Sequence, residues 1–114
     1  MEAEKILNAA LAAISQRHGE DTEAYDMRGV SILADYYVVT SASSNRQLHA
    51  LANAIVAAMH DLNYTGYRIE GTRSSNWLLV DLGDVIVNVF TEEARAFYGL
   101  EKLWSQGKPL EVQD

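Results

Sequence analysis

The sequence predicts a single α+β domain, an α/β sandwich in which helices pack on a mixed β-sheet of about five strands. Two long segments carry apolar residues at helical spacing, and segments rich in β-branched and aromatic residues lie between and after them. The resulting order, α-β-β-α-β-β-β-α, is typical of one sheet covered by helices. With 114 residues, 48% of them hydrophobic, and no cysteine, the chain can bury a core without disulfides.

The first predicted helix covers residues 2–17 and ends before Gly19. One stripe of its apolar residues recurs at helical spacing: Ile6, Leu7, Ala10, Leu11 and Ile14. A short strand over residues 24–28 is weakly indicated. Residues 36–40 are rich in aromatic and β-branched side chains, and they predict a second strand.

The second predicted helix covers residues 45–62, and Ser43 or Ser44 can cap it. Its apolar positions give the most regular periodicity in the chain: Leu48, Leu51, Ala52, Ile55, Val56 and Met59. A strand over residues 67–70 follows.

Residues 76–90, NWLLVDLGDVIVNVF, predict a β-hairpin with a two-residue loop at Gly83-Asp84. In this register Trp77 pairs with Phe90. One hairpin face is wholly aliphatic: Leu78, Val80, Leu82, Val85, Val87 and Val89. The other face is mixed: Trp77, Leu79, Asp81, Ile86, Asn88 and Phe90. Because full burial of that face would leave polar groups unpaired, we expect Trp77 to be an exposed anchor for a partner.

Thr91 can cap a last helix that begins at Glu92, and Gly99 should break it. Phe90 and Phe97 are expected in the core. Residues 100–104 are expected to form a further turn. The predicted domain covers residues 1–107, and residues 108–114 are expected to be a loose tail.

The net charge of −7 argues against binding to a phosphate backbone, which needs a basic patch. We therefore expect no direct, sequence-specific nucleic-acid binding, and the acidic surface favours a basic protein partner. No apolar run approaches the roughly 20 residues that cross a bilayer, and the first residues lack the pattern of a secretory signal. The sequence predicts a cytoplasmic protein that does not bind membranes.

Motifs for catalysis, metals or cofactors are weak. None of the three histidines lies in a metal-ligand pattern, and no glycine-rich phosphate loop is present. No cofactor is therefore expected. Asp81 and Asp84 are the one pair of carboxylates in or beside a hairpin, and such pairs can bind Mg²⁺, although aspartate is also common in turns.

Three segments resemble the ribosomal silencing factor family, also called the Iojap family: ADYYVVTSASSNRQLHALANAI, GTRSSNWLLVDLGDVIVNVF and EEARAFYGLEKLW. The resemblance spans residues 4–104. It implies a fold with a nucleotidyltransferase-like core and no catalysis. It also implies a translation repressor that binds the large ribosomal subunit through the basic ribosomal protein fourteen and sterically blocks joining of the small subunit when nutrients are short.

Carried over by position, the resemblance implies a partner-binding surface made of Trp77, Leu79, Asp81, Tyr98, Leu100, Glu101, Lys102 and Trp104. Asp81 is expected beside Trp77, where it would receive a lysine or arginine. The sequence departs from the family at Asn88, where histidine is common. Two alternatives stay open: an enzyme that uses Asp81 and Asp84 with Mg²⁺ for nucleotidyl transfer, and a homodimer formed through the mixed hairpin face.

Overall fold

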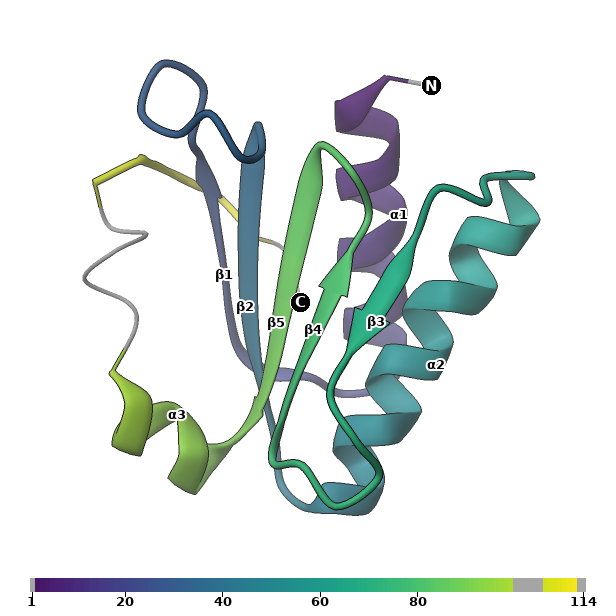
Figure 1. Cartoon of the computed structure of the whole chain (residues 1–114), viewed down its shortest axis with the longest axis vertical. Coiled ribbons are helices and arrows are strands. Elements are labelled where there is room, and N and C mark those ends of the chain that lie inside the picture. The colour runs from purple at the N-terminus through teal and green to yellow at the C-terminus, as the bar shows by residue number, and fades with distance from the viewer. Residues whose placement is uncertain (1, 100–105, 113–114) are drawn as a thin grey trace.

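A computed structural model of the chain describes residues 2–99 and 106–112, and these form a mixed sheet with helices on both faces (Figure 1). The strands are β1 (Glu20–Asp26), β2 (Tyr36–Ala42), β3 (Arg68–Glu70), β4 (Trp77–Asp81), β5 (Val85–Thr91) and β6 (Lys108–Leu110). The helices are α1 (Ala3–Gln16), α2 (Asn45–Asp61) and α3 (Glu92–Tyr98).

The sheet order is β3-β4-β5-β2-β1-β6. The central pair, β2 and β5, is parallel, and the other four pairs are antiparallel. Helices α1 and α2 cover one face, while α3 lies against the other face at one end of the sheet (Figure 1). The predicted fold class is confirmed, with six strands instead of about five. The nucleotidyltransferase-like character of the core stays a prediction.

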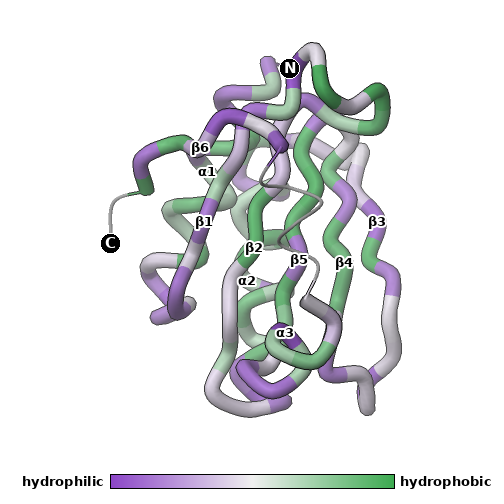
Figure 2. The backbone as a smooth tube through the Cα atoms, turned by 90° about the vertical axis from the view of Figure 1, so that its left-hand side faces the viewer, coloured by the Kyte–Doolittle hydropathy of each residue, from purple (hydrophilic) through white to green (hydrophobic). Residues whose placement is uncertain are grey.

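The two long helices match their predicted ranges to within one or two residues because their apolar stripes face the sheet. Ser44 caps α2, accepting a hydrogen bond from the backbone N–H of Gln47 at 3.1 Å. The main core lies between these helices and the central strands, whose residues are the hydrophobic centre of the tube in Figure 2. In the parts of the chain that the structure describes, no helix is long and apolar enough to span a membrane.

The β4–β5 hairpin has the predicted register. Trp77 pairs with Phe90, and the N–H of Leu82 donates to the carbonyl of Val85 at 2.8 Å, which closes the loop at Gly83-Asp84. Gly83 has a φ of +88°, in the left-handed region that favours glycine. All six aliphatic side chains of the inner face are at most 2% exposed. The hairpin therefore contributes one complete face to the main core.

The predicted loose tail is wrong for residues 108–110. They form β6, an edge strand antiparallel to β1, in which Lys108 pairs with Asp26 and Leu110 with Ala24. Pro109 lacks an N–H and is tolerated there because an edge strand needs hydrogen bonds on one side only. Three residues are too few to show strand alternation in the sequence. The domain therefore extends past residue 107.

Substitution of Gly83 by alanine is expected to lower the free energy of unfolding by about 1–3 kcal/mol. The cost has two sources: the positive φ, and an added Cβ that would lie 2.9 Å from the hydroxyl of Tyr64. That hydroxyl donates to the carbonyl of Leu82 at 2.8 Å, so it is not free to move. Urea denaturation measures the effect.

Gly29→Ala is the matched control. Gly29 also has a positive φ, of +81°, but nothing lies within 4 Å of an added Cβ. Gly83→Ala should therefore cost more than Gly29→Ala. Equal losses would contradict the contribution of the Tyr64 contact.

Candidate functional site

Helix α3 is placed at the end of β5 by its two caps. The hydroxyl of Thr91 accepts from the N–H of Ala94 at 3.3 Å, and Glu92 and Glu93 in the first turn complement the helix dipole. Gly99 adopts the left-handed conformation with a φ of 57°, and its N–H donates to the carbonyl of Arg95 at 3.0 Å. The sequence therefore determines both ends of this short helix.

Arg95 holds α3 against the sheet. Its side chain is only 11% exposed, and Nη2 lies 2.7 Å from the Glu23 carboxylate on β1. Nη1 donates to the carbonyl of Asp21 at 2.7 Å and to the hydroxyl of Ser41 at 2.9 Å. Because a guanidinium has donors in a fixed planar fork, these contacts determine the orientation of α3 relative to β1 and β2.

Trp77 is half-buried, and three neighbours fix its indole. The ring stacks on Phe90 with centroids 5.2 Å apart and planes at 22°, and it packs against Tyr98 at 5.0 Å. Its Nε1–H donates to Oδ1 of Asn88 at 3.0 Å. Asn88 is 3% exposed, and its buried amide oxygen is satisfied by the indole. The mixed hairpin face can thus be largely covered without leaving its polar groups unpaired.

A hollow of about 510 Å³ lies between this indole and α3. We call it the aromatic groove, and its lining residues are Ser75, Asn76, Trp77, Glu93, Ala94, Phe97 and Tyr98. Phe97 is 82% exposed and Tyr98 is 48% exposed. The prediction that Phe97 belongs to the core is wrong: α3 meets the sheet through Ala94 and Arg95, and Phe97 lies outside that contact. Phe90, by contrast, is buried as predicted.

The structure brings some of the predicted site residues together and separates others. Trp77 and Tyr98 are in contact, and Leu79 is half-buried two residues further along the same face of β4. Asp81 shares this face but lies at the other end of β4, about 13 Å away at the usual strand rise. The expectation that Asp81 lies beside Trp77 is therefore wrong.

Asp81 makes its contacts within the chain. Its Oδ1 accepts from the N–H of Gly83 at 2.8 Å, and its Oδ2 lies 3.6 Å from the guanidinium of Arg68. This carboxylate thus supports the hairpin turn. Among residues 2–99 and 106–112, no group of three or more histidine, aspartate or glutamate side chains could hold a metal ion.

Four predicted residues, Leu100, Glu101, Lys102 and Trp104, lie outside the described residues. The predicted site also lacked five residues that line the groove, Ser75, Asn76, Glu93, Ala94 and Phe97, and the buried hydrogen-bond partner Asn88. Glu93 and Phe97 are four residues apart on α3, which places them on one side of the helix. That spacing was available in the sequence, but the expectation that Phe97 is buried obscured it.

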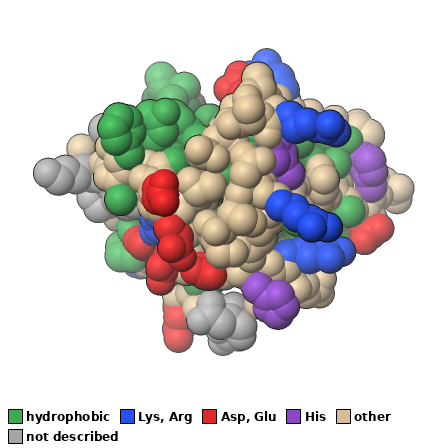
Figure 3. Space-filling view, turned by 90° about the horizontal axis from the view of Figure 1, so that it is seen from below, with side chains coloured by type: hydrophobic (Ala, Val, Ile, Leu, Met, Phe, Trp, Pro, Cys, Tyr) green, Lys and Arg blue, Asp and Glu red, His purple; other side chains and the backbone are tan. Residues whose placement is uncertain are grey.

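Acidic side chains lie next to the aromatic groove. Viewed from the α3 end of the sheet, they gather beside hydrophobic side chains, while lysine and arginine lie toward α2 (Figure 3). Glu92 raises the pKa of the neighbouring Glu20 carboxyl, first through a shared hydrogen bond and then through like-charge repulsion. The surface around the groove is therefore suited to a positively charged partner.

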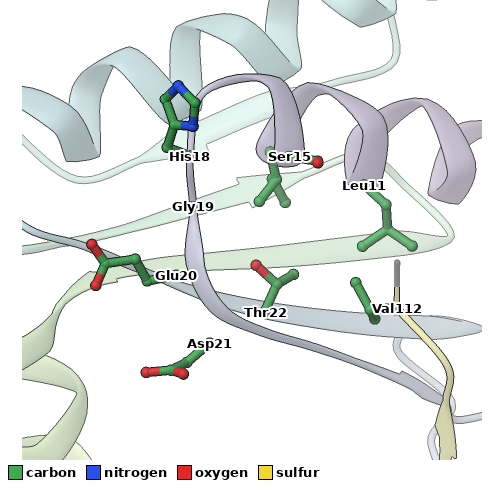
Figure 4. Close-up of a pocket in the computed structure, with 9 residues that line it drawn as sticks. Leu11, Ser15, His18, Gly19, Glu20, Asp21, Thr22 and Val112 are labelled. Atoms are coloured by element: carbon green, nitrogen blue, oxygen red, sulfur yellow. The ribbon is translucent and has the colours of Figure 1, made fainter. Parts of the chain in front are cut away.

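A second hollow, of about 490 Å³, lies between the end of α1 and β1. Leu11, Thr22 and Val112 lie near one another there, whereas His18 and Glu20 point away from them (Figure 4). No nucleophile and base converge on this hollow, so its geometry does not favour it as a catalytic centre.

Comparison with known proteins assigns the family. The family model described as "Ribosomal silencing factor during starvation" matches residues 1–114. The chain belongs to this family. It is 39% identical over 104 residues to the ribosomal silencing factor of Bacillus subtilis, covering 91% of this chain and 88% of that one. It is 36% identical over 74 residues to a mouse protein named for mitochondrial assembly of the ribosomal large subunit, covering 62% of this chain and 32% of the mouse protein.

The fold agrees with this family assignment. The crystal structure of a Chromobacterium violaceum protein superposes with a TM-score of 0.87 at 32% identity, covering 100% of this chain and 95% of that one. The resemblance read from the three sequence segments is thus confirmed at the level of the family. Membership indicates a ribosome-associated role in translation or assembly.

Asn88→Ala is expected to lower the free energy of unfolding by about 1–2 kcal/mol, because the indole N–H of Trp77 loses its acceptor. The indole N–H signal in NMR spectra should shift, and its hydrogen exchange should become faster. Asn53→Ala, on the exposed side of α2, is the control and should change neither. An unchanged indole signal in Asn88→Ala would contradict the hydrogen bond.

The Glu20 carboxyl is expected to titrate above its ordinary pKa of 4.5. The folded state then holds this proton more tightly than the unfolded chain. It gains stability as the pH falls from the raised pKa to the ordinary value and loses it as the pH rises through that window.

Carbon-detected NMR titration measures this pKa directly. Glu92→Gln should bring the pKa of Glu20 back toward the ordinary value, whereas Glu93→Gln, the next residue of α3, should not. A Glu20 pKa that does not respond to Glu92→Gln would exclude the Glu20–Glu92 interaction.

Proposed function

We propose that the chain binds the large ribosomal subunit through the basic ribosomal protein fourteen and sterically blocks joining of the small subunit, mainly when nutrients are short. Family membership supports the ribosome-associated role, and the name of the mouse relative points to the large subunit. In this proposal the chain acts in the cytoplasm by occupying a surface. It needs no catalytic group, cofactor, membrane or sequence-specific nucleic acid.

The observation that carries this proposal is an aromatic groove beside acidic side chains. Trp77, Phe97 and Tyr98 offer an accessible apolar surface, and tryptophan and tyrosine are the commonest anchors of protein interfaces. Glu93 lines the groove, so a basic protein would meet apolar and negative chemistry together. Arg95 and Asn88 hold this surface in shape before binding, which lowers the entropy cost of association.

The proposed partner surface starts at Trp77, Leu79 and Tyr98. It continues along the chain into the four predicted residues that follow α3. Asp81 lies at the far end of β4, beside Arg68. There it would form a separate contact with the partner. The partner would therefore lie along the β4 strand and across α3.

A homodimer through the same groove is compatible with this proposal. Two copies would then cover each other's anchors, and the dimer would be a storage form that must separate before docking. Light scattering at micromolar concentration, compared between the wild type and Phe97→Ala, distinguishes a groove-mediated dimer from a monomer.

Phe97→Ala and Trp77→Ala are each expected to weaken binding to large subunits by about 2 kcal/mol or more, since both remove a central apolar anchor. Phe97 is the sharper probe because its exposed side chain contributes little to the core. Co-sedimentation with purified large subunits at moderate salt measures the loss.

Ile32→Ala is the matched control. Ile32 is also a large exposed hydrophobic residue, 102% exposed, but it lies in the β1–β2 loop at the other end of the sheet (Figure 1). The Ile32→Ala variant should co-sediment with large subunits as the wild type does. If Phe97→Ala and Trp77→Ala pellet as well as Ile32→Ala, the groove is not the docking surface. If the wild type itself fails to pellet, the proposed function fails.

A further inference from the structure

Helix α1 and strand β2 both begin at the end of the sheet away from α3 (Figure 1). A polar cleft opens there. Two hollows meet there, of about 290 and 450 Å³, and both are lined by Glu4, Arg28 and Tyr36. We call the combined space the Tyr36 cleft. It shares no lining residue with the aromatic groove.

Tyr36 is a buried residue whose polar end is unused. It is 3% exposed and belongs to the main core, yet its hydroxyl makes no hydrogen bond with any described residue. Every buried side-chain nitrogen or oxygen in the described part of the chain has a partner. The Tyr36 oxygen is therefore not sealed in the core but reaches the wall of the cleft. A phenylalanine at position 36 would fill the core equally well, so packing does not account for the hydroxyl.

The one arginine of the cleft is already neutralised. Arg28 lies over the Tyr36 ring at 5.5 Å, and its Nε and Nη2 donate to the two oxygens of Asp26 at 3.0 and 2.7 Å. This pairing lowers the pKa of Asp26 to about 2. Arg28 and Asp26 together thus add no net charge to the cleft.

Among the described residues, the other charged side chains that line the cleft are all carboxylates. Four carboxylates line it without an ion pair to another residue that the structure describes: Glu2, Glu4, Asp35 and Glu111. Burial raises the pKa of Tyr36. Arg28 opposes this effect, whereas carboxylates that include Glu4 and Asp35 add to it. Its hydroxyl therefore stays neutral and keeps an oxygen lone pair that can accept a hydrogen bond. An anion would be repelled here, whereas a cation would find both charge and an acceptor.

The floor of the cleft is aliphatic. Leu7 and Leu11 of α1 and Leu110 of β6 line the smaller of the two hollows, which reaches toward β6. A hydrated metal ion would gain nothing from these side chains. A cation on a hydrocarbon chain would bury its methylenes against them and keep its charged head among the carboxylates.

We propose that the Tyr36 cleft binds a primary ammonium group carried on an aliphatic chain. The ammonium donates to the Tyr36 oxygen and pairs with Glu4 and Asp35, and the methylenes lie on the three leucines. A lysine side chain of a bound protein and a free polyamine share this chemistry. The inference is independent of the large-subunit proposal, because it concerns another end of the molecule.

Amide NMR titration of the full chain tests the proposal with two probes at constant ionic strength, spermidine and Nα-acetyl-lysine N-methylamide. Saturable shifts at Asp35, Tyr36 and Glu4 are expected with at least one of them. Binding of spermidine alone identifies a polyamine site, and binding of the blocked lysine identifies a site for a protein side chain. Absence of saturable shifts with both probes would overturn the proposal. So would equal shifts with magnesium chloride.

Tyr36→Phe removes the proposed acceptor and is expected to weaken binding about tenfold, as for the loss of a hydrogen bond to a charged group. The fold should persist because the hydroxyl has no partner to lose. Tyr37→Phe removes a hydroxyl from the next residue of β2, which faces the opposite side of the sheet, and should bind like the wild type. Tyr36→Phe binding as tightly as Tyr37→Phe would overturn the site.

Glu4→Gln and Asp35→Asn test the charge in the same way. Each should weaken binding severalfold, whereas Glu70→Gln on the distant edge strand β3 should not. If all three substitutions have equal effects, the probes are responding only to the net negative charge, and the proposed cleft is excluded.

Discussion

The register of the β4–β5 hairpin is the constraint on which the rest of the molecule depends. Side chains alternate along a strand, so a slip of one residue would exchange the aliphatic face for the mixed face. The tight loop at Gly83-Asp84 prevents such a slip. A slip would also cost free energy, because it would expose the six buried aliphatic side chains to water. The same register brings Trp77 opposite Phe90, and α3 then begins where β5 ends.

The mixed face shows how a protein can keep polar groups under an aromatic surface. Asn88 is buried, yet its amide oxygen meets the indole N–H, so neither group loses its hydrogen bond on leaving water. This hydrogen bond holds the indole in one orientation, in which its ring packs against Phe90 and Tyr98. Asn88 is a group whose charge does not change with pH. The hydrogen bond between the indole and Asn88 therefore does not depend on titration of the acceptor.

Periodic patterns predicted the fold well, and contacts distant in sequence were not predictable. The stripe of α2 and the alternation of the hairpin gave correct elements because each is a local consequence of one buried face. Strand β6 was not predicted because three residues are too few to show the alternation of a strand in the sequence. Phe97 was predicted in the core only because it is aromatic. No local pattern in the sequence shows that α3 meets the sheet through Ala94 and Arg95. Trp77 was predicted as an anchor from the mixed hairpin face and Tyr98 from the family resemblance, and the two rings are in contact. Asp81 was placed beside Trp77 because the two share a face, although strand geometry separates positions four residues apart.

Arg95 has a consequence for how the chain acquires its surface during folding. Its guanidinium contacts residues 54, 72 and 74 positions earlier in the chain, on two neighbouring strands. Such contacts have a high loop-closure cost and form only after the sheet that carries them is in place. A chain that has not completed its sheet therefore lacks the contacts that orient α3. The arginine thus makes the placement of this helix depend on prior completion of the sheet.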